Sequence, residues 1–299
     1  MHPERKEISG YFISQLNAVW VSADQLKRKE FASQSLQTFH NYVLGEPFLD
    51  QSLAVLDRDI WGNLDETRTV PSTDRFGYTK VVAGIDWGTH DNHIVISGLR
   101  PDGKMDILNL VRVPVTNDYR NIDADINRTI AELNLYEPDL ILADLGYNGT
   151  KVNRLIQEFG KDKVFGVKVN PSRAVGEIKP SFNKAGNLVT LDKLSGNMFM
   201  ISQLKSGNIK FWNNSHDKEL QTLLNHLKNI MILEEEDDDG NFHKVIKQKN
   251  SSQPDHYGQA LVYAVAAIRY LLDEDSYKND FTYMDIDANG MGYGNGFTV

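Results

Sequence analysis

The chain has 299 residues, a formal net charge of −9 and no cysteine, which excludes disulfide bonds, thiolate catalysis and cysteine-bound zinc. Its composition, 40% hydrophobic and 24% charged, is that of an ordinary globular protein, and no apolar run reaches the ~20 residues that span a bilayer. Because lysine and arginine supply most of the non-specific affinity for nucleic acid, the acidic balance predicts that the chain alone holds DNA weakly.

The N-terminal region is predicted to be helical and separate from the main domain. Residues 7–30 and Ser33–Leu44 have helical patterns, and Gly45 with Pro47 ends the second of them. The segment that follows, up to Lys80, is rich in Asp, Arg, Gly and Thr, which indicates a connection. We expect four parts: a helical tail and linker (1–50), a connecting segment (51–79), the main domain (80–275) and a loose C-terminal tail (276–299).

The main domain opens with three strand-like runs, and the turn sequence Arg100–Gly103 predicts that the second and third are antiparallel neighbours. Helices and strands alternate after that. The expected elements are strands at Lys80–Asp86, His93–Leu99, Met105–Val113, Asp139–Asp144 and Val164–Lys168, and helices at Asp118–Leu135 and Thr150–Phe159. This order predicts a mixed α/β sheet in which the first and fourth strands lie side by side.

The rest of the main domain is predicted to contain a cationic loop, three helices and a hairpin. The loop, Asn170–Asn187, carries Arg173, Lys179 and Lys184, and we expect a surface loop rather than a phosphate contact. The six carboxylates of Glu234–Asp239 are expected at a hairpin tip rather than at a metal site. The helices are expected at Asp192–Leu204, His216–Leu227 and Ala260–Leu272, and the hairpin strands at Ile230–Leu233 and Phe242–Ile246.

Three aspartates stand at the ends of these elements. Asp86 and Asp144 each end a buried strand, and Asp255 follows Pro254 at the start of the last helix, where it can either cap the helix or face a metal. Together they are the ligands that two divalent ions need for phosphodiester hydrolysis, and hard oxygen donors favour Mg²⁺ or Mn²⁺. We therefore expect Asp86 to bridge two ions, with Asp144 and Asp255 completing the site.

The sequence around these aspartates carries a family resemblance. The stretches concerned are Gly84–Gly88, Leu142–Asp144 with Gly149 and the helix after it, Asp255–Ala264 and, nearer the N-terminus, Gly10–Trp20 and Phe39–Pro47. They resemble the ribonuclease H-like nucleases, and in particular the nuclease domain of large terminase subunits from tailed double-stranded DNA phages. The resemblance implies a ribonuclease H-like fold and a metal-dependent DNA endonuclease whose catalytic residues are Asp86, Asp144 and Asp255.

The resemblance also implies a biological setting. Such proteins are packaging motors that cut concatemeric viral DNA in the cytoplasm of the host cell, together with a small terminase subunit and a portal protein, and no membrane takes part. The chain contains no Gly-x-x-x-x-Gly-Lys-Ser/Thr phosphate loop. We therefore expect a C-terminal fragment that carries the nuclease and not the ATPase site.

Several polar residues near the three motifs are weighed as further ligands or phosphate contacts. Gln259 stands where relatives often have a second acidic residue, which leaves Asp255 as the stronger metal ligand and His256 as a second candidate. His93 and Asp91 are expected to be structural. Lys168 ends the fifth expected strand and Arg173 follows it, and we do not expect either to contact phosphate.

Two alternatives remain open on the sequence. The stretch Gly84–Thr89 also resembles the first phosphate loop of sugar kinases and actin-like ATPases, in which Asp86 would act with magnesium and Gly88 and Thr89 would hold ATP phosphates. Too little chain follows Asp144 for the second domain that those proteins need. The other alternative is a catalytically silent docking module of the packaging machine. The three candidate acids argue against it, because mutually repelling carboxylates have no structural purpose in a site that has lost its activity.

Overall fold

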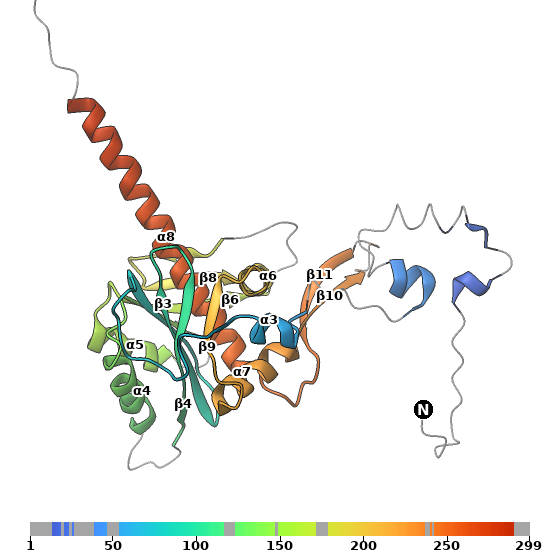
Figure 1. Cartoon of the computed structure of the whole chain (residues 1–299), viewed down its shortest axis with the longest axis horizontal. Helices are drawn as coiled ribbons and strands as arrows, with labels where there is room; N and C mark the ends of the chain where they lie inside the picture. The colour runs from blue at the N-terminus through green and yellow to red at the C-terminus, as the bar shows by residue number, and fades with distance from the viewer. Residues whose placement is uncertain are drawn as a thin grey trace, which may run out of the picture.

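A computed structural model gives the fold of the chain (Figure 1). It describes residues 54–116, 123–146, 149–171, 179–236, 240 and 242–289, and within the N-terminal part residues 14–18, 21–23, 26 and 39–46. Of the expected N-terminal helices, the structure describes a 3₁₀ turn at Gln15–Asn17 and a π-helical turn at Phe39–Leu44. The other residues of that region, and Arg173, lie outside the described residues.

The main body is a mixed sheet of nine strands with the order β1-β9-β4-β3-β2-β5-β6-β8-β7. The strands are β1 (Leu64–Asp65), β2 (Lys80–Asp86), β3 (Asp91–Leu99), β4 (Met105–Pro114), β5 (Leu140–Asp144), β6 (Val164–Asn170), β7 (Ser181–Asn183), β8 (Leu188–Asp192) and β9 (Ile209–Trp212). The predicted centre is confirmed: β2, β3 and β4 are antiparallel in turn, and β5 pairs with β2 in parallel. The sheet is therefore the ribonuclease H-like mixed sheet that the sequence predicts.

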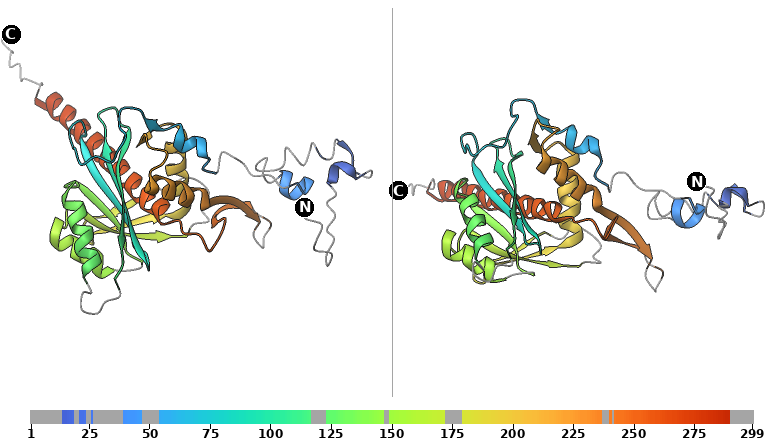
Figure 2. Two further views of the ribbon diagram at one scale, coloured as in Figure 1. Left: turned by 60° about the horizontal axis from the view of Figure 1, so that its bottom comes forward. Right: turned by 90° about the horizontal axis from the view of Figure 1, so that it is seen from below.

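Helices cover both faces of the sheet (Figure 2). One face packs against α4 (Ala124–Asn134) and α5 (Gly149–Phe159) through Val81, Ala83 and Ile85 of β2. The other face, which carries Val82 of β2 and Leu142 of β5, packs against α6 (Lys193–Lys205), α7 (Lys218–Asn229) and α8 (His256–Asn289). Because strand side chains alternate between faces, Asp86 and Asp144 belong to the face that α8 covers.

Helix α8 lies directly on the backbone of β2. A Cβ atom at Gly84 would come within 2.0 Å of the carbonyl oxygen of Ala260 and 2.6 Å of the amide nitrogen of Ala264. Only glycine permits this approach. The contact fixes where α8 crosses the sheet, and it places the first residues of the helix at the end of β2.

Several elements were not predicted. Four short strands (β1, β7, β8 and β9) extend the sheet, and the expected connecting segment contains α3 (Asp57–Trp61) as well as β1, which pairs with β9. The cationic loop is shorter than expected, because β7 and β8 form within and after it. A loose tail is expected from residue 276, but helix α8 continues to Asn289, and no Gly or Pro occurs between residues 276 and 289 to end it.

The hairpin prediction is confirmed, with β10 (Ile230–Glu236) and β11 (Phe242–Gln248) antiparallel and projecting from the body (Figure 1). The tip residues 237–239 and 241 lie outside the described residues. Within the part of the chain that the structure describes, no helix is long and apolar enough to cross a membrane.

Candidate metal centre

Two of the predicted acids stand side by side where β2 and β5 end. The last paired residues of these parallel strands are Ile85 and Ala143, and Asp86 and Asp144 follow them in the same register. Neighbouring strands lie about 4.8 Å apart, so the two carboxylates leave the sheet next to each other. Asp86 is buried and Asp144 is half-buried. The sheet therefore brings the two acids together, as the strand order predicts.

The third acid arrives with the first turn of α8. Asp255 precedes the helix, and its carbonyl oxygen accepts the hydrogen bond of the Gln259 amide at 3.0 Å. Its carboxylate accepts from the side-chain amides of Gln248, at 3.0 Å, and Gln259, at 3.2 Å. Gln259 thus donates to the carboxylate of Asp255 and orients it. We call the end of the sheet that carries Asp86, Asp144 and Asp255 the acidic edge.

His256 is joined to the acidic edge by a direct bond. Its Nδ1 lies 2.7 Å from Oδ2 of Asp86. This hydrogen bond raises the pKa of His256, which means that Asp86 favours the protonated imidazole. The residue therefore acts here as the partner of Asp86, whereas the sequence offered it as a second metal ligand.

The three carboxylates influence one another. Burial raises the pKa of Asp86 to about 6; the negative charges of Asp144 and Asp255 act in the same direction, and the bond from His256 acts against them. Tyr263, on the buried face of α8, has its pKa raised by burial and then by the charges of the same three acids. The acids thus share one electrostatic environment, in which a bound cation would relieve their repulsion.

The side chains at the acidic edge are of a chemical type that binds divalent metal ions. Carboxylate oxygens are the ligands that Mg²⁺ and Mn²⁺ prefer. Among the described residues, however, no three acidic or histidine side chains are placed closely enough to hold an ion as they stand. Each acid instead accepts a hydrogen bond from the protein, Asp144 from the amide of Gly146 at 3.1 Å. Metal binding would require these side chains to turn toward a common centre.

A cluster of histidines supports the acidic edge, and one of them is His93, which is expected from the sequence to be structural. His93 is paired with Asp86 across β2 and β3, and its ring stacks on that of His256 with centroids 5.0 Å apart. Burial lowers the pKa of His93 to about 3, so the ring is neutral at pH 7. The strand register is the signal that could have revealed His93, since any residue opposite Asp86 in β3 must lie beside the site.

His226 holds the start of α8 from a neighbouring helix. Its Nδ1 accepts the backbone amide of Tyr257 at 3.1 Å, inside the core. The hydroxyl of Tyr257 donates to Glu219 at 2.7 Å, and Glu219 pairs with Arg112 of β4. Burial lowers the pKa of His226 to about 4, which keeps Nδ1 free to accept. The first turn of α8 is thus tied to both α7 and the sheet.

The turn after Asp86 has a structural reason for its glycine. A Cβ at Gly88 would lie 2.2 Å from the carbonyl oxygen of Asp91, so the tight connection from β2 to β3 requires glycine whatever the function. Lys168 is exposed and alternates along β6 with Val167, so it lies on the opposite face from Asp144. Its position agrees with the expectation that it does not contact a phosphate at this site.

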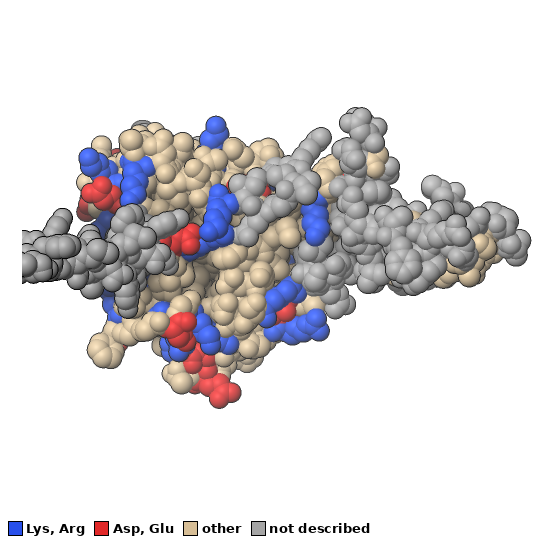
Figure 3. Space-filling view, turned by 90° about the horizontal axis from the view of Figure 1, so that it is seen from above, with Lys and Arg blue, Asp and Glu red and all other residues tan. Residues whose placement is uncertain are grey.

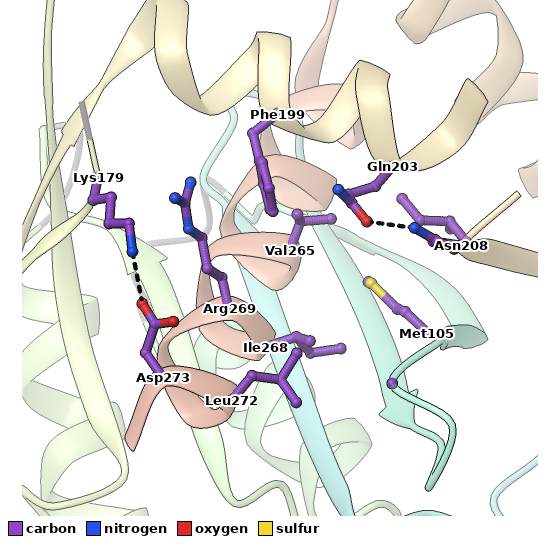
Figure 4. A pocket seen from close by; sticks show the side chains of 12 residues that line it. Met105, Lys179, Phe199, Gln203, Asn208, Val265, Ile268, Arg269, Leu272 and Asp273 are labelled. Carbon is purple, nitrogen blue, oxygen red and sulfur yellow. Dashed lines mark hydrogen bonds and ion pairs between the residues drawn. The ribbon is translucent and has the colours of Figure 1, made fainter. Parts of the chain in front are cut away.

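A well-formed pocket lies elsewhere on the molecule (Figure 4). It has a volume of about 240 Å³ and lies between α6, α8 and β9. Arg269 stacks over the ring of Phe199 at 4.3 Å, and Lys179 pairs with Asp273 at its rim. These residues of α8 come three or more turns after Asp255, so the pocket is separate from the acidic edge.

The strand order, with acids at the ends of β2 and β5 and at the start of α8, defines a fold of the ribonuclease H-like class. No protein-family model matches the sequence, and no curated protein matches it. Solved structures similar to the chain include the large terminase of a thermophilic bacteriophage, with 14% identity and a TM-score of 0.43 over 85% of this chain and 53% of that one. The chain thus spans about half the length of that terminase.

Two further similar structures are of smaller proteins. The human cytomegalovirus terminase nuclease domain, soaked in Mn, has 13% identity and a TM-score of 0.41, over 71% of this chain and 93% of that one. A mutant fragment of the large terminase subunit of bacteriophage Sf6, with calcium, has 13% identity and a TM-score of 0.44, over 71% of this chain and 98% of that one. These proteins are of the kind that the sequence motifs resemble, while the fold assignment itself rests on the strand order of this chain.

Proposed function

We propose that this chain is a metal-dependent DNA endonuclease that cleaves concatemeric viral DNA during genome packaging. The observation that carries the proposal is the meeting of Asp86, Asp144 and Asp255 at one edge of a ribonuclease H-like sheet. The three residues come from elements far apart in the sequence, and each is delivered to this edge by a separate structural constraint.

The protein groups have distinct tasks in this proposal. Asp86, Asp144 and Asp255 would hold the metal, and His256 is the remaining candidate ligand. Two Mg²⁺ or Mn²⁺ ions, when bound, would supply an activated water and neutralise charge on the leaving 3′ oxygen. His256 orients the carboxylate of Asp86 through its Nδ1, and the stacked ring of His93 keeps His256 from turning away.

The wider setting follows the resemblance of the sequence motifs to large terminases. We propose that the chain is the nuclease part of a packaging motor in the host cytoplasm, acting on double-stranded DNA with a small terminase subunit and a portal protein. Its net charge of −9 suits a nuclease to which the other parts of such a motor present the DNA, because weak intrinsic affinity limits indiscriminate cutting.

The alternatives receive less support. A phosphate loop at Gly84–Thr89 would not explain why α8 delivers Asp255 and His256 to the end of β2, and Gly88 is accounted for by the turn alone. Burial raises the pKa of Asp86 to about 6. A silent docking module gives no reason to keep a buried carboxyl group with a raised pKa, whereas such groups are common at active sites.

The test is nicking of supercoiled plasmid in Mn²⁺ by Asp86→Asn and Asp144→Asn, with Asp162→Asn as control, since Asp162 is exposed in the turn before β6. Loss of a residue that only orients a metal ligand costs about 10–100-fold, so loss of a ligand itself should reduce nicking by more than about a hundredfold, while the control retains the wild-type rate. Circular dichroism checks the fold. Folded Asp86→Asn protein that nicks at the wild-type rate would rule the proposal out.

A further inference from the structure

A second feature of the molecule lies directly beside Asp255. An open groove of about 750 Å³ runs between the C-terminal half of α7 and the turn that joins β11 to α8. The turn ends at Pro254, so the groove reaches the residue that precedes Asp255. Its lining residues are Thr222, Asn225, His226, Lys228, Asn229, Lys249, Asn250, Gln253 and Pro254.

The wall of the groove is held in place by Asn229. Its side-chain amide donates to the carbonyl oxygens of Asn250, at 3.1 Å, and Gln253, at 2.7 Å, and its Oδ1 accepts the amide of Asn250 at 2.8 Å. The backbone amide of Lys249 donates to the carbonyl oxygen of Asn229 at 2.8 Å. A buried asparagine thus fixes the turn, and the groove is formed before any ligand arrives.

The chemistry of the groove contrasts with that of the whole chain. The protein has 41 acidic and 32 basic residues, yet among the described residues the lining contains two lysines, several amides and no carboxylate. Lys228 forms an ion pair with Asp57 of α3, and both side chains are substantially exposed. An exposed ion pair contributes little stability, so Lys228 can exchange Asp57 for another anion at low cost.

On another face of the molecule the basic residues do not gather in this way. Figure 3 shows lysine and arginine side chains spread around a broad uncharged surface, with acidic side chains among them. The groove differs from that face, because its described lining has two lysines and no carboxylate.

We propose that this groove binds the phosphate backbone of a DNA strand next to the scissile phosphate. The proposal rests on the nuclease function proposed above. It concerns the DNA backbone beside the phosphate that is cleaved. Three carboxylates repel a polyanion, so a strand that reaches them needs cations close by. Lys228 and Lys249 supply the charge, and the amides of Asn225 and Gln253 can donate to phosphate or sugar oxygens without reading sequence.

The test is binding of a fluorescent DNA duplex, measured by anisotropy in EDTA so that no cleavage occurs, over a range of salt concentrations. The variant Lys228→Gln/Lys249→Gln is compared with Lys161→Gln/Lys163→Gln, two exposed lysines at the opposite end of the sheet, before β6. Each lost phosphate contact reduces the slope of log K against log salt by about 0.9. We expect a slope smaller by about 1–2 for the groove variant and an unchanged slope for the control.

A second variant separates charge from folding. Asn225 is exposed on α7, so Asn225→Asp adds a carboxylate to the groove without disturbing the core, and it should weaken DNA binding. Equal salt slopes for the groove variant and its control, with Asn225→Asp binding as wild type, overturn the proposal. Binding is measured without metal, so the two proposals are tested separately. A protein that binds DNA through the groove but never cuts it would contradict the proposed nuclease function and support the proposed DNA-binding groove.

Discussion

At the scale of single residues, His226 determines where the first turn of α8 begins. The amide of Tyr257 is one of the helix-end donors that have no partner inside the helix, and it is buried. Left unpaired, such a group costs about 1–3 kcal/mol. His226 satisfies it from α7, and the next residue toward the N-terminus is His256, the partner of Asp86. We therefore regard His226 as a positioning residue for the acidic edge.

This role predicts different results for two substitutions of the same histidine. His226→Asn keeps an acceptor oxygen near the position of Nδ1, whereas His226→Leu fills the space without an acceptor. The leucine variant should lose about 1–3 kcal/mol in the free energy of unfolding and nick plasmid more slowly, and the asparagine variant should recover most of both losses. Urea denaturation and nicking at saturating Mn²⁺ give the two readouts. Equal losses in the two variants would show that ring packing matters and the hydrogen bond does not.

The sequence predicts some of these residues and not others, for a physical reason. Asp86 and Asp144 are visible because each ends a continuous apolar run, a pattern that depends on a few neighbouring residues. Asp255 is visible as a helix start but ambiguous between a cap and a ligand. His93 and His226 touch their partners across the sheet and between helices, and such contacts leave no local pattern.

At the scale of elements, the packing of α8 on β2 determines where the residues of the acidic edge lie. The close approach at Gly84 sets the position of the helix along the strand, and the histidine contacts fix its first turn. The acidic edge is thus assembled by the same contact that forms the core on this face. Sequence predicts the helix and the strand but not their contact distance, which depends on the absence of one Cβ atom.

A change at Gly84 should therefore affect both stability and activity. Gly84→Ala places a methyl group against the backbone of Ala260 and Ala264, which cannot move aside, and overpacking of this kind costs about 1–3 kcal/mol. The matched control is Gly149→Ala at the start of α5, where the new Cβ would only meet Leu145 at 3.5 Å. Thermal unfolding compares the two. A Gly84→Ala protein as stable as wild type, with full nicking, contradicts the proposed role of this contact.

At the scale of the whole molecule, the acidic edge exists only when three distant parts of the chain come together. The centre of the sheet is predictable, because its strands are long and separated by clear turns and helices. The outer strands β1 and β9 are not, since they have 2 and 4 residues and pair in parallel with partners far along the chain. The strands that carry Asp86 and Asp144 are thus the parts that sequence patterns reveal best.

The most direct test of the central claim is the position of Mn²⁺ in a crystal soaked with the ion, located by its anomalous scattering. The account predicts a peak within ligand distance, about 2.0–2.4 Å, of carboxylate oxygens of both Asp86 and Asp144, with Asp255 or His256 completing the shell. In a crystal of Asp86→Asn the peak should be lost or much weakened. No peak at saturating Mn²⁺, or a peak bound away from Asp86 and Asp144, would contradict the account.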